Sequence, residues 1–267
     1  MTTVLEGRDL VLGYQRAAVV HGVSVRLEPG RVTALIGPNG SGKSTVLRSL
    51  ARLHPVAEGR VTLDDADTAP LSAKEFARRV TLLSQSRPHP SGLEVRDVVA
   101  FGRHPHRGRF AGATDADRAA VDHAMAVTGI ADMAGRPVDQ LSGGELQRVW
   151  LATCLAQDTA VVLLDEPTNH LDLRYQVETL DLVRDLADRH GTALGVVLHD
   201  LNHAATVADQ VVLLHQGTVR AVGTPVDVLT PAHLSAVYGL PIRCLVDPDT
   251  GAVRVEAQGR HRRHRSR

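Results

Sequence analysis

The sequence predicts an α/β fold built around a parallel sheet, and three short apolar runs support this prediction. The runs are residues 32–36, 161–164 and 194–198, and glycine or polar residues follow each of them directly. Continuous apolar runs of this kind are typical of strands that are buried on both faces, as in parallel sheets. Since the carboxyl ends of parallel strands share one edge of the sheet, the residues after the runs are expected to face a ligand crevice.

Two further regions are expected to flank this core. Residues 4–12, 19–27 and 60–65 are rich in β-branched and apolar residues, which predicts strands in the N-terminal part of the chain. The segment at about residues 87–153 is mostly helical in pattern. In it, Thr114 with Asp117 predicts the capped start of a helix that runs to about residue 128. We therefore expect residues 1–258 to form one domain, with a helical subdomain inserted at about residues 87–153.

A glycine-rich segment connects the first apolar run to a helical pattern that begins near Val46. It fits the pattern G-x-x-x-x-G-K-S between a strand and a helix, which is the context that a phosphate-binding loop requires. Glycines let backbone N–H groups converge on a polyphosphate, and the helix N-terminus adds its positive dipole end. The sequence therefore predicts a P-loop NTPase core. The expected nucleotide-binding residues here are Gly37, Pro38, Asn39, Gly40, Ser41, Gly42, Lys43, Ser44 and Thr45.

Lys43 stands out because the chain contains only two lysines, Lys43 and Lys74, against 28 arginines. Arginine is thus used almost wherever a surface cation is needed, and the phosphate loop is an exception. A compact ammonium group reaches between β- and γ-phosphates, where a broad guanidinium group would collide. This choice of residue favours a phosphate-binding role over a chance glycine-rich turn.

Composition and length indicate an ordinary globular protein. The chain has 267 residues, of which 43% are apolar and 22% are charged. Its N-terminus lacks the basic and apolar segments of a signal peptide, and no apolar run approaches the ~20 residues that span a bilayer. Any membrane role is therefore expected to act through a partner. Two isolated cysteines, Cys154 and Cys244, fit a reducing compartment better than a disulfide or metal framework.

The formal net charge is zero, but the charge is unevenly distributed. Residues 259–267 contain five arginines and no acid, so residues 1–258 hold 25 basic and 30 acidic side chains. Two interpretations of this basic tail stay open. It is either a disordered, solvated end or a segment that contacts anionic lipid or RNA.

Two acidic residues end the second apolar run. Asp165 is expected to complete a Mg²⁺ shell together with the Ser44 hydroxyl, and Glu166 can point at the attacking water. His199 ends the third run beside Asp200, within reach of a γ-phosphate. The competing interpretations are solvated acids at a strand end and a histidine that merely neighbours a helix cap.

A second glycine-rich segment precedes the helical run 148–156. Ser142, Gly143 and Gly144 lie at its start, where Ser142 fits the N-cap position of a helix. The same arrangement also forms a second anion site. One chain with one bound nucleotide has no obvious use for two such sites.

These motifs, in this order, resemble the nucleotide-binding subunit of an ATP-binding cassette (ABC) transporter over roughly residues 4–225. Residues 37–45 match the Walker A motif, 161–166 the Walker B motif and 141–147 the family signature. Gln85 matches the Q-loop, Asp172 the D-loop, His199 the switch histidine and Tyr14 the aromatic residue that stacks on adenine, which is the weakest of these matches.

The resemblance implies a RecA-like core with an N-terminal antiparallel β subdomain and the inserted helical subdomain. It also implies an ATPase that pairs head to tail with a second copy around two ATP molecules. Ser142, Gly143, Gly144 and Asp172 of one subunit would then contact the nucleotide held by the other. Glu166 would act as general base, Lys43 would neutralise developing charge, His199 would stabilise the γ-phosphate, and Gln85 would join the catalytic and Mg²⁺ sites. The implied cofactors are ATP and Mg²⁺.

Within the family, the segments 102–106, 199–204 and 238–240 are similar to importers of iron–siderophore complexes, with haem or cobalamin as other possible cargoes. The resemblance implies a homodimer at the cytoplasmic face of the membrane. It implies transmembrane permease subunits, which would dock on residues 85–110, and through them an extracytoplasmic substrate-binding protein.

Two alternatives remain open. Residues 165–172 also resemble soluble ABC proteins that act on ribosomes or RNA, but those proteins usually carry two cassettes in one chain, so no nucleic acid partner is expected. The chain could also energise an exporter, because cargo and direction are set by proteins outside it.

Overall fold

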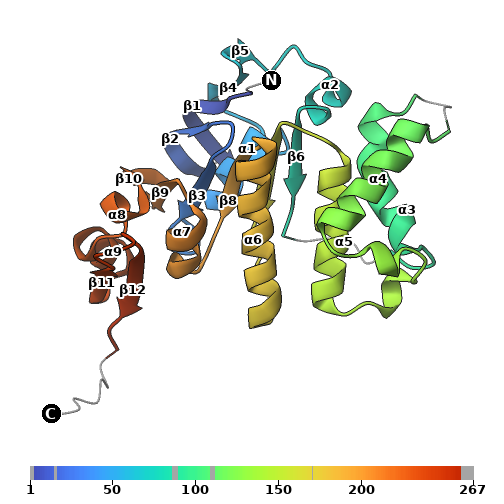
Figure 1. Cartoon of the computed structure of the whole chain (residues 1–267). Helices are drawn as coiled ribbons and strands as arrows, with labels where there is room; N and C mark the ends of the chain where they lie inside the picture. Colours follow the sequence, from blue (N-terminus) through green and yellow to red (C-terminus); the bar gives the residue numbers. More distant parts are fainter. Residues whose placement is uncertain (1–2, 15–16, 86–89, 109–111, 170, 260–267) are drawn as a thin grey trace, which may run out of the picture.

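A central sheet of six strands organises the molecule, as the computed structural model of the chain shows (Figure 1). The structure describes residues 3–14, 17–85, 90–108, 112–169 and 171–259. In the sheet, the strand order is β10-β9-β3-β8-β7-β6, and every neighbouring pair is parallel except β9 with β10. The strands are β3 (Val32–Ile36), β6 (Val80–Leu83), β7 (Val161–Asp165), β8 (Ala193–Val197), β9 (Gln210–His215) and β10 (Thr218–Gly223).

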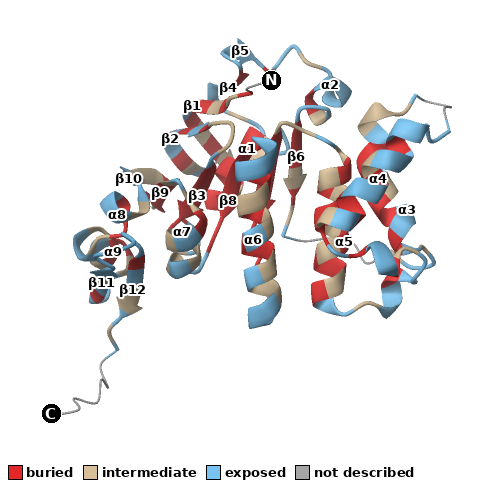
Figure 2. Cartoon of the chain, in the orientation of Figure 1, coloured by how far each residue is buried: buried red, intermediate tan, exposed pale blue. Residues whose placement is uncertain are grey.

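Both faces of this sheet are covered, as the apolar runs predict. Val32 and Ile36 face a core that includes α6 (Leu173–His190) and α7 (Leu201–Val207), whereas Leu35 faces a core that includes α1 (Lys43–Leu50). All residues of β3, β7 and β8 are buried. In Figure 2, β3 and β8 are red at the centre of the molecule. The predicted α/β fold with a parallel core is confirmed.

A second, antiparallel sheet with the order β2-β1-β4-β5 packs over α1. Its strands are β1 (Leu5–Tyr14), β2 (Ala17–Leu27), β4 (Glu58–Leu63) and β5 (Ala66–Asp67). Most of these residues belong to the regions in which the sequence predicts strands. Tyr14 ends β1 rather than lying between two strands. The short helix α2 (Ala73–Ala77) begins with a capping box formed by Ser72 and Glu75, and β6 follows it.

Helices follow between β6 and β7, and they stand to one side of the central sheet (Figure 1). They are α3 (Val95–Ala100), the 3-10 helix η1 (Phe101–His106), α4 (Asp115–Val127), η2 (Ala131–Met133), η3 (Val138–Gln140) and α5 (Gly143–Ala156). Val98, Met125 and Val149 pack in a core of their own. As predicted, Thr114 caps α4, and its hydroxyl accepts a hydrogen bond from Asp117 N at 3.1 Å.

The segment 102–106, which the sequence analysis links to siderophore importers, attaches η1 to the end of α5. Arg103 donates to Ala156 O at 2.8 Å and forms a buried ion pair with Asp117 at 2.9 Å. The ring of His106 lies 2.8 Å from Gln157 O through Nε2. Cationic and donor groups satisfy the open carbonyls at a helix C-terminus. This segment therefore fixes the position of α5.

The chain ends in two short helices and a hairpin that lie beside α7 (Figure 1). These elements are α8 (Pro225–Val228), α9 (Pro231–Tyr238), β11 (Ile242–Val246) and β12 (Val253–Ala257). Residues 260–267 of the predicted basic tail lie outside the described residues. Among the helices of the described residues, none is long and apolar enough to cross a membrane.

Candidate active site

The predicted phosphate loop lies between β3 and α1, with its lysine inside the loop. Lys43 is only 5% exposed, and its Nζ donates to Gly37 O at 2.8 Å and to Pro38 O at 2.9 Å. Burial lowers the pKa of Lys43, while the charges of Glu166 and Asp165 oppose this shift. The ammonium group is thus held where it can exchange backbone carbonyls for phosphate oxygens.

Gly37 occupies a position that excludes any side chain. Its φ of 143° lies in a region that L-residues rarely adopt, and a Cβ atom would come within 2.0 Å of Leu214 O. Gly42, the last residue before α1, has a φ of 97°. These conformations explain why the loop carries glycine at both positions.

Ser44 and Asp165 form an oxygen-rich pair beside the loop. Ser44 Oγ donates to Asp165 Oδ1 at 2.7 Å, and the other carboxylate oxygen, Oδ2, lies 3.6 Å from Arg48. Asp165 is fully buried, which raises its pKa. Oδ2 accepts no hydrogen bond from any described residue. A buried carboxylate oxygen without a hydrogen-bond donor, next to a hydroxyl, fits the oxygen ligands that Mg²⁺ prefers.

No group of three or more His, Cys, Asp or Glu side chains that could hold a metal occurs among the described residues. The Ser44–Asp165 pair can therefore hold Mg²⁺ only with further oxygens from the nucleotide or water, which is the usual way in which Mg²⁺ is bound at phosphate sites. Gln85 contacts Glu166 rather than this pair.

Glu166 is the centre of a group of polar side chains. Gln85 Nε2 donates to Glu166 Oε2 at 2.5 Å, Asn169 Nδ2 donates to the same oxygen, and His199 Nε2 contacts Oε1. The Glu166 side chain is 7% exposed, and its backbone has a φ of 55°. Strained backbone at a buried carboxylate is typical of functional sites, because surrounding contacts must maintain it.

A cavity of about 480 Å³ joins these groups into one site. Its lining includes Lys43 and Ser44 from the phosphate loop and Gln85, Glu166 and His199 from three strand ends. The strand ends thus meet at one crevice, as the parallel sheet predicts. Tyr14 and Asn39 line the same cavity. A loop of amide donors, a lysine, a hydroxyl–carboxylate pair and a second carboxylate can together bind a nucleoside triphosphate and activate a water.

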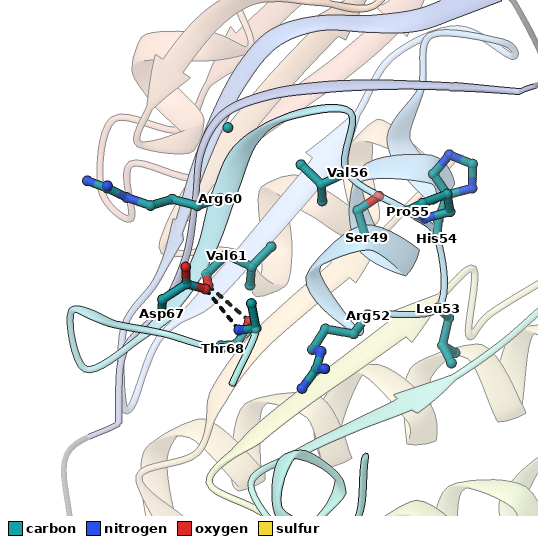
Figure 3. A pocket seen from close by; sticks show the side chains of 12 residues that line it. Ser49, Arg52, Leu53, His54, Pro55, Val56, Arg60, Val61, Asp67 and Thr68 are labelled. Atoms are coloured by element: carbon teal, nitrogen blue, oxygen red, sulfur yellow. Dashed lines mark hydrogen bonds between the residues drawn. The ribbon is translucent and has the colours of Figure 1, made fainter. Parts of the chain in front are cut away.

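Tyr14 is half-exposed, and its ring packs against His54 with 4.5 Å between the ring centroids. His54 also lines a second cavity, of about 580 Å³, between the end of α1 and the edge of β4 and β5. Figure 3 shows this cavity with Ser49 and Arg52 on one side and Arg60 and Asp67 on the other. It contains none of the predicted site residues.

The predicted second anion site lies at the N-terminus of α5, and none of its residues lines the cavity that holds Lys43. Ser142 and Gly143 are exposed. Ser142 Oγ accepts from Glu145 N at 3.3 Å, and hydrogen bonds from Ser142 together with Arg136 lower the pKa of Glu145 to about 2. Ser142 thus serves as the N-cap, as its position in the sequence predicts.

Tyr175 of α6 lies behind the second anion site. Its ring would come within 2.6 Å of a Cβ atom on Gly144, which explains the glycine there. Asp172 is the N-cap of α6, where its Oδ1 accepts from Tyr175 N at 3.0 Å. Ser142, Gly143, Gly144 and Asp172 therefore surround the start of two helices, separate from the cavity of the same chain.

A hydrogen bond of Gln147 connects the two regions within the chain. Gln147 of α5 donates through Nε2 to Pro167 O at 2.6 Å, one residue after Glu166. The helix that begins at Ser142 is therefore tied to the loop that carries the candidate general base.

Two residues that contact the carboxylates of this site, Arg48 and Asn169, were not predicted from the sequence. Arg48 lies one turn after Ser44 on α1 and contacts Asp165, and Asn169 lies three residues after Glu166 and contacts its carboxylate. The spacing of Asn169 was visible in the sequence, because a turn brings residues three apart together. Nothing in the sequence marked Arg48, since arginines are frequent throughout the chain.

Comparisons with known proteins agree with this geometry. A family model described as "ABC transporter" matches residues 20–169. The ferric enterobactin transport ATP-binding protein FepC of Escherichia coli (strain K12) is 42% identical over 256 residues, covering 96% of this chain and 94% of the relative. The hemin import ATP-binding protein HmuV of Streptomyces coelicolor is 47% identical over 237 residues, covering 89% of this chain and 84% of the relative.

A solved structure has the same fold over nearly the whole chain. It is an inward-facing conformation of a putative metal-chelate type ABC transporter, with a TM-score of 0.84 and 25% sequence identity. The match covers 97% of this chain and 98% of the solved one. The likeness thus includes α8, α9 and the C-terminal hairpin as well as the central sheet.

Proposed function

This chain belongs to the ABC transporter family as an ATP-hydrolysing subunit, and we propose that it energises a separate membrane permease that imports iron–siderophore complexes. The separation of two half-sites in one chain is the observation that carries the proposed mode of ATP hydrolysis, in a dimer of two such chains. The cavity with Lys43 and Glu166 and the helix tip with Ser142 lie apart. In a head-to-tail homodimer, each ATP would be enclosed by the cavity of one copy and the helix tip of the other.

Each half-site would contribute different chemistry to hydrolysis. In the cavity, the loop N–H groups and Lys43 would bind the phosphates, while Tyr14 lies where a base can stack on its ring. From the partner, the amides at the exposed N-terminus of α5 would complete the binding of the γ-phosphate. Because the charge on the nucleotide is satisfied only when both faces are present, ATP favours closure of the dimer and its cleavage favours opening.

Three side chains would take part in the attack of water on the γ-phosphate. Glu166 would accept its proton, His199 would stabilise the γ-phosphate, and Gln85 would orient Glu166. Mg²⁺, held by Ser44 and Asp165, would neutralise the charge that develops on the phosphate oxygens. Arg48 would compensate the charge of the buried Asp165 carboxylate.

The cargo is proposed from the relatives. FepC is named for ferric enterobactin and HmuV for hemin, so iron carried by an organic chelate or porphyrin is the common cargo class. Such cargo would be delivered by an extracytoplasmic binding protein to the permease, and this chain would work at the cytoplasmic face of the membrane. Cobalamin, a related metal chelate, remains a second cargo.

The permease is proposed to dock where η1 meets α2. Within the predicted segment 85–110, residues 86–89, 109 and 110 lie outside the described residues. Phe101 is 51% exposed there, so its ring is accessible to a partner. Arg78 and Lys74 of α2 donate to Pro105 O and Arg107 O at 2.8 and 2.6 Å. Together with the contacts of Arg103 to α5, this network would carry a movement of η1 to Ser142.

Isolation of the full-length chain from detergent-solubilised membranes of its own cells tests this function. We expect a polytopic permease to be recovered with it, and we expect Phe101→Asp to reduce this recovery at least ~10-fold, since an interface anchor is lost. Val226→Asp, which changes another half-exposed apolar residue on α8, should retain the permease.

Two results of this isolation would contradict the proposal. Recovery of ribosomal RNA and proteins in place of a permease would favour a soluble ATPase that acts on ribosomes. If vesicles that contain the recovered permease and this chain transport iron chelates in the direction of export, the result would favour an exporter.

A further inference from the structure

The C-terminal elements α9, β11 and β12 form a module, residues 231–257, that packs on the face of the central sheet covered by α6 and α7. Leu234, Ile242 and Val253 of this module are buried in the same core as β3 and α7. Nothing in the proposed hydrolysis mechanism requires these elements. Two of the segments that resemble siderophore importers, 199–204 and 238–240, nevertheless meet the module or belong to it.

Asn202 forms a two-point connection between α7 and β12. Its Oδ1 accepts from Val255 N at 2.8 Å, and its Nδ2 donates to Val255 O at 3.3 Å. The amide side chain thus pairs with the strand backbone as a neighbouring strand would. Because an amide carries an acceptor oxygen and a donor nitrogen side by side, Asn is suited to this double contact.

The connected end of α7 is the end that carries the switch histidine. Asp200 caps α7 by accepting from Asn202 N at 2.7 Å and from His203 N at 3.3 Å, and His199 precedes this cap. The His199 side chain reaches Glu166 Oε1 from this position. Since α7 has only seven residues, its own hydrogen bonds give little resistance to a shift of its first turn.

A second contact of the module reaches the phosphate loop. Tyr238, at the end of α9, is mostly buried, and its pKa is raised to about 12 by burial, against the effect of a hydrogen bond from the backbone of Gly37. Tyr238 packs against the core that includes Ile36, the residue before this loop. The module therefore touches both the segment before Lys43 and the segment after His199.

We propose that Asn202 is a positioning residue, which fixes the first turn of α7 against β12 and so holds His199 beside Glu166. This inference rests on the proposed role of His199 in hydrolysis. It assigns the C-terminal module a part in catalysis in addition to its part in the core. A purely structural role would predict instead that loss of Asn202 lowers stability and leaves the turnover of the folded enzyme unchanged.

The test compares ATP hydrolysis by full-length Asn202→Ala, Thr206→Ala and His199→Ala. We expect kcat of Asn202→Ala to fall on the order of 10-fold with KM for ATP nearly unchanged, because a displaced catalytic group slows the chemical step more than it weakens binding. Asn202→Asp keeps the acceptor for Val255 N and should lie between Asn202→Ala and the unchanged chain. Thr206→Ala alters another exposed residue of α7, whose hydroxyl donates to the backbone carbonyl of Asn202 within the helix, and it should retain full kcat.

The outcomes separate this inference from the proposed site. Unchanged kcat in Asn202→Ala, together with loss of activity in His199→Ala, would overturn the positioning role and leave the site assignment intact. Full activity in His199→Ala would instead overturn the role of His199 itself, and the inference with it. A loss in Asn202→Ala that matches a smaller folded fraction, measured by circular dichroism, would assign Asn202 to stability alone.

Discussion

Replacement of Glu166 by glutamine should reduce the kcat of ATP hydrolysis by at least ~100-fold, the usual contribution of a general base, while ATP binding is retained. The amide has the shape of the carboxylate and fits the same contacts. Its oxygen can accept from Gln85 and Asn169, and its NH₂ group can donate to a neutral His199 ring. It cannot take a proton from water. Steady-state hydrolysis and equilibrium ATP binding, measured on the same preparation, check both parts.

Glu178→Gln is the matched control for this experiment. Glu178 lies on α6, where it forms an ion pair with the exposed Arg174. The Glu178→Gln variant should hydrolyse ATP at the unchanged rate. Wild-type turnover in Glu166→Gln would remove Glu166 from the mechanism. Loss of ATP binding in this variant would show that the carboxylate supports the nucleotide site rather than the water.

Replacement of Lys43 by arginine should weaken ATP binding by about 100-fold, although the positive charge is kept. Two charge-assisted hydrogen bonds of the ammonium group to phosphate, at ~1.5 kcal/mol each, correspond to this loss. Lys43 is almost fully buried, and its Nζ lies within 2.9 Å of two loop carbonyls, which leaves no room for a guanidinium group. Titration with a fluorescent ATP analogue measures the change.

Lys74→Arg provides the control, because Lys74 is the other lysine of the chain. It is exposed and donates to Arg107 O from the surface of α2, so arginine should replace it without effect on ATP binding. Equal ATP affinity in Lys43→Arg and Lys74→Arg would show that the loop needs only a cation, contrary to the steric argument.

The strands of the core were predictable because their burial requires short apolar runs. The continuous apolar run 161–164 predicts a buried strand, and the acids that follow it lie at the carboxyl end of that strand. The phosphate loop was equally predictable, since its glycines and Lys43 are the residues that the backbone geometry demands. The sequence therefore predicted the crevice and most of the side chains that line it.

Contacts that depend on tertiary packing could not be predicted in this way. The helix α6 carries many charged residues, and the sequence analysis assigned no helix there, although Asp172 is its N-cap. The segment 102–106 was recognised only by resemblance, and its contacts to α5 appear only when α4 and α5 are packed together. The pairing of Asn202 with Val255 joins residues 53 positions apart, which no local pattern can reveal.

Sedimentation velocity of Glu166→Gln with saturating ATP and Mg²⁺ tests the central claim most directly, that ATP is enclosed between two copies of the chain. We expect a species of twice the chain mass of 28.6 kDa with ATP, and a single-chain species without nucleotide. The dimer should be lost in Glu166→Gln combined with Ser142→Arg, because the helix tip then clashes with the partner's nucleotide. A sample that remains monomeric at saturating ATP, with or without its permease, would contradict the account.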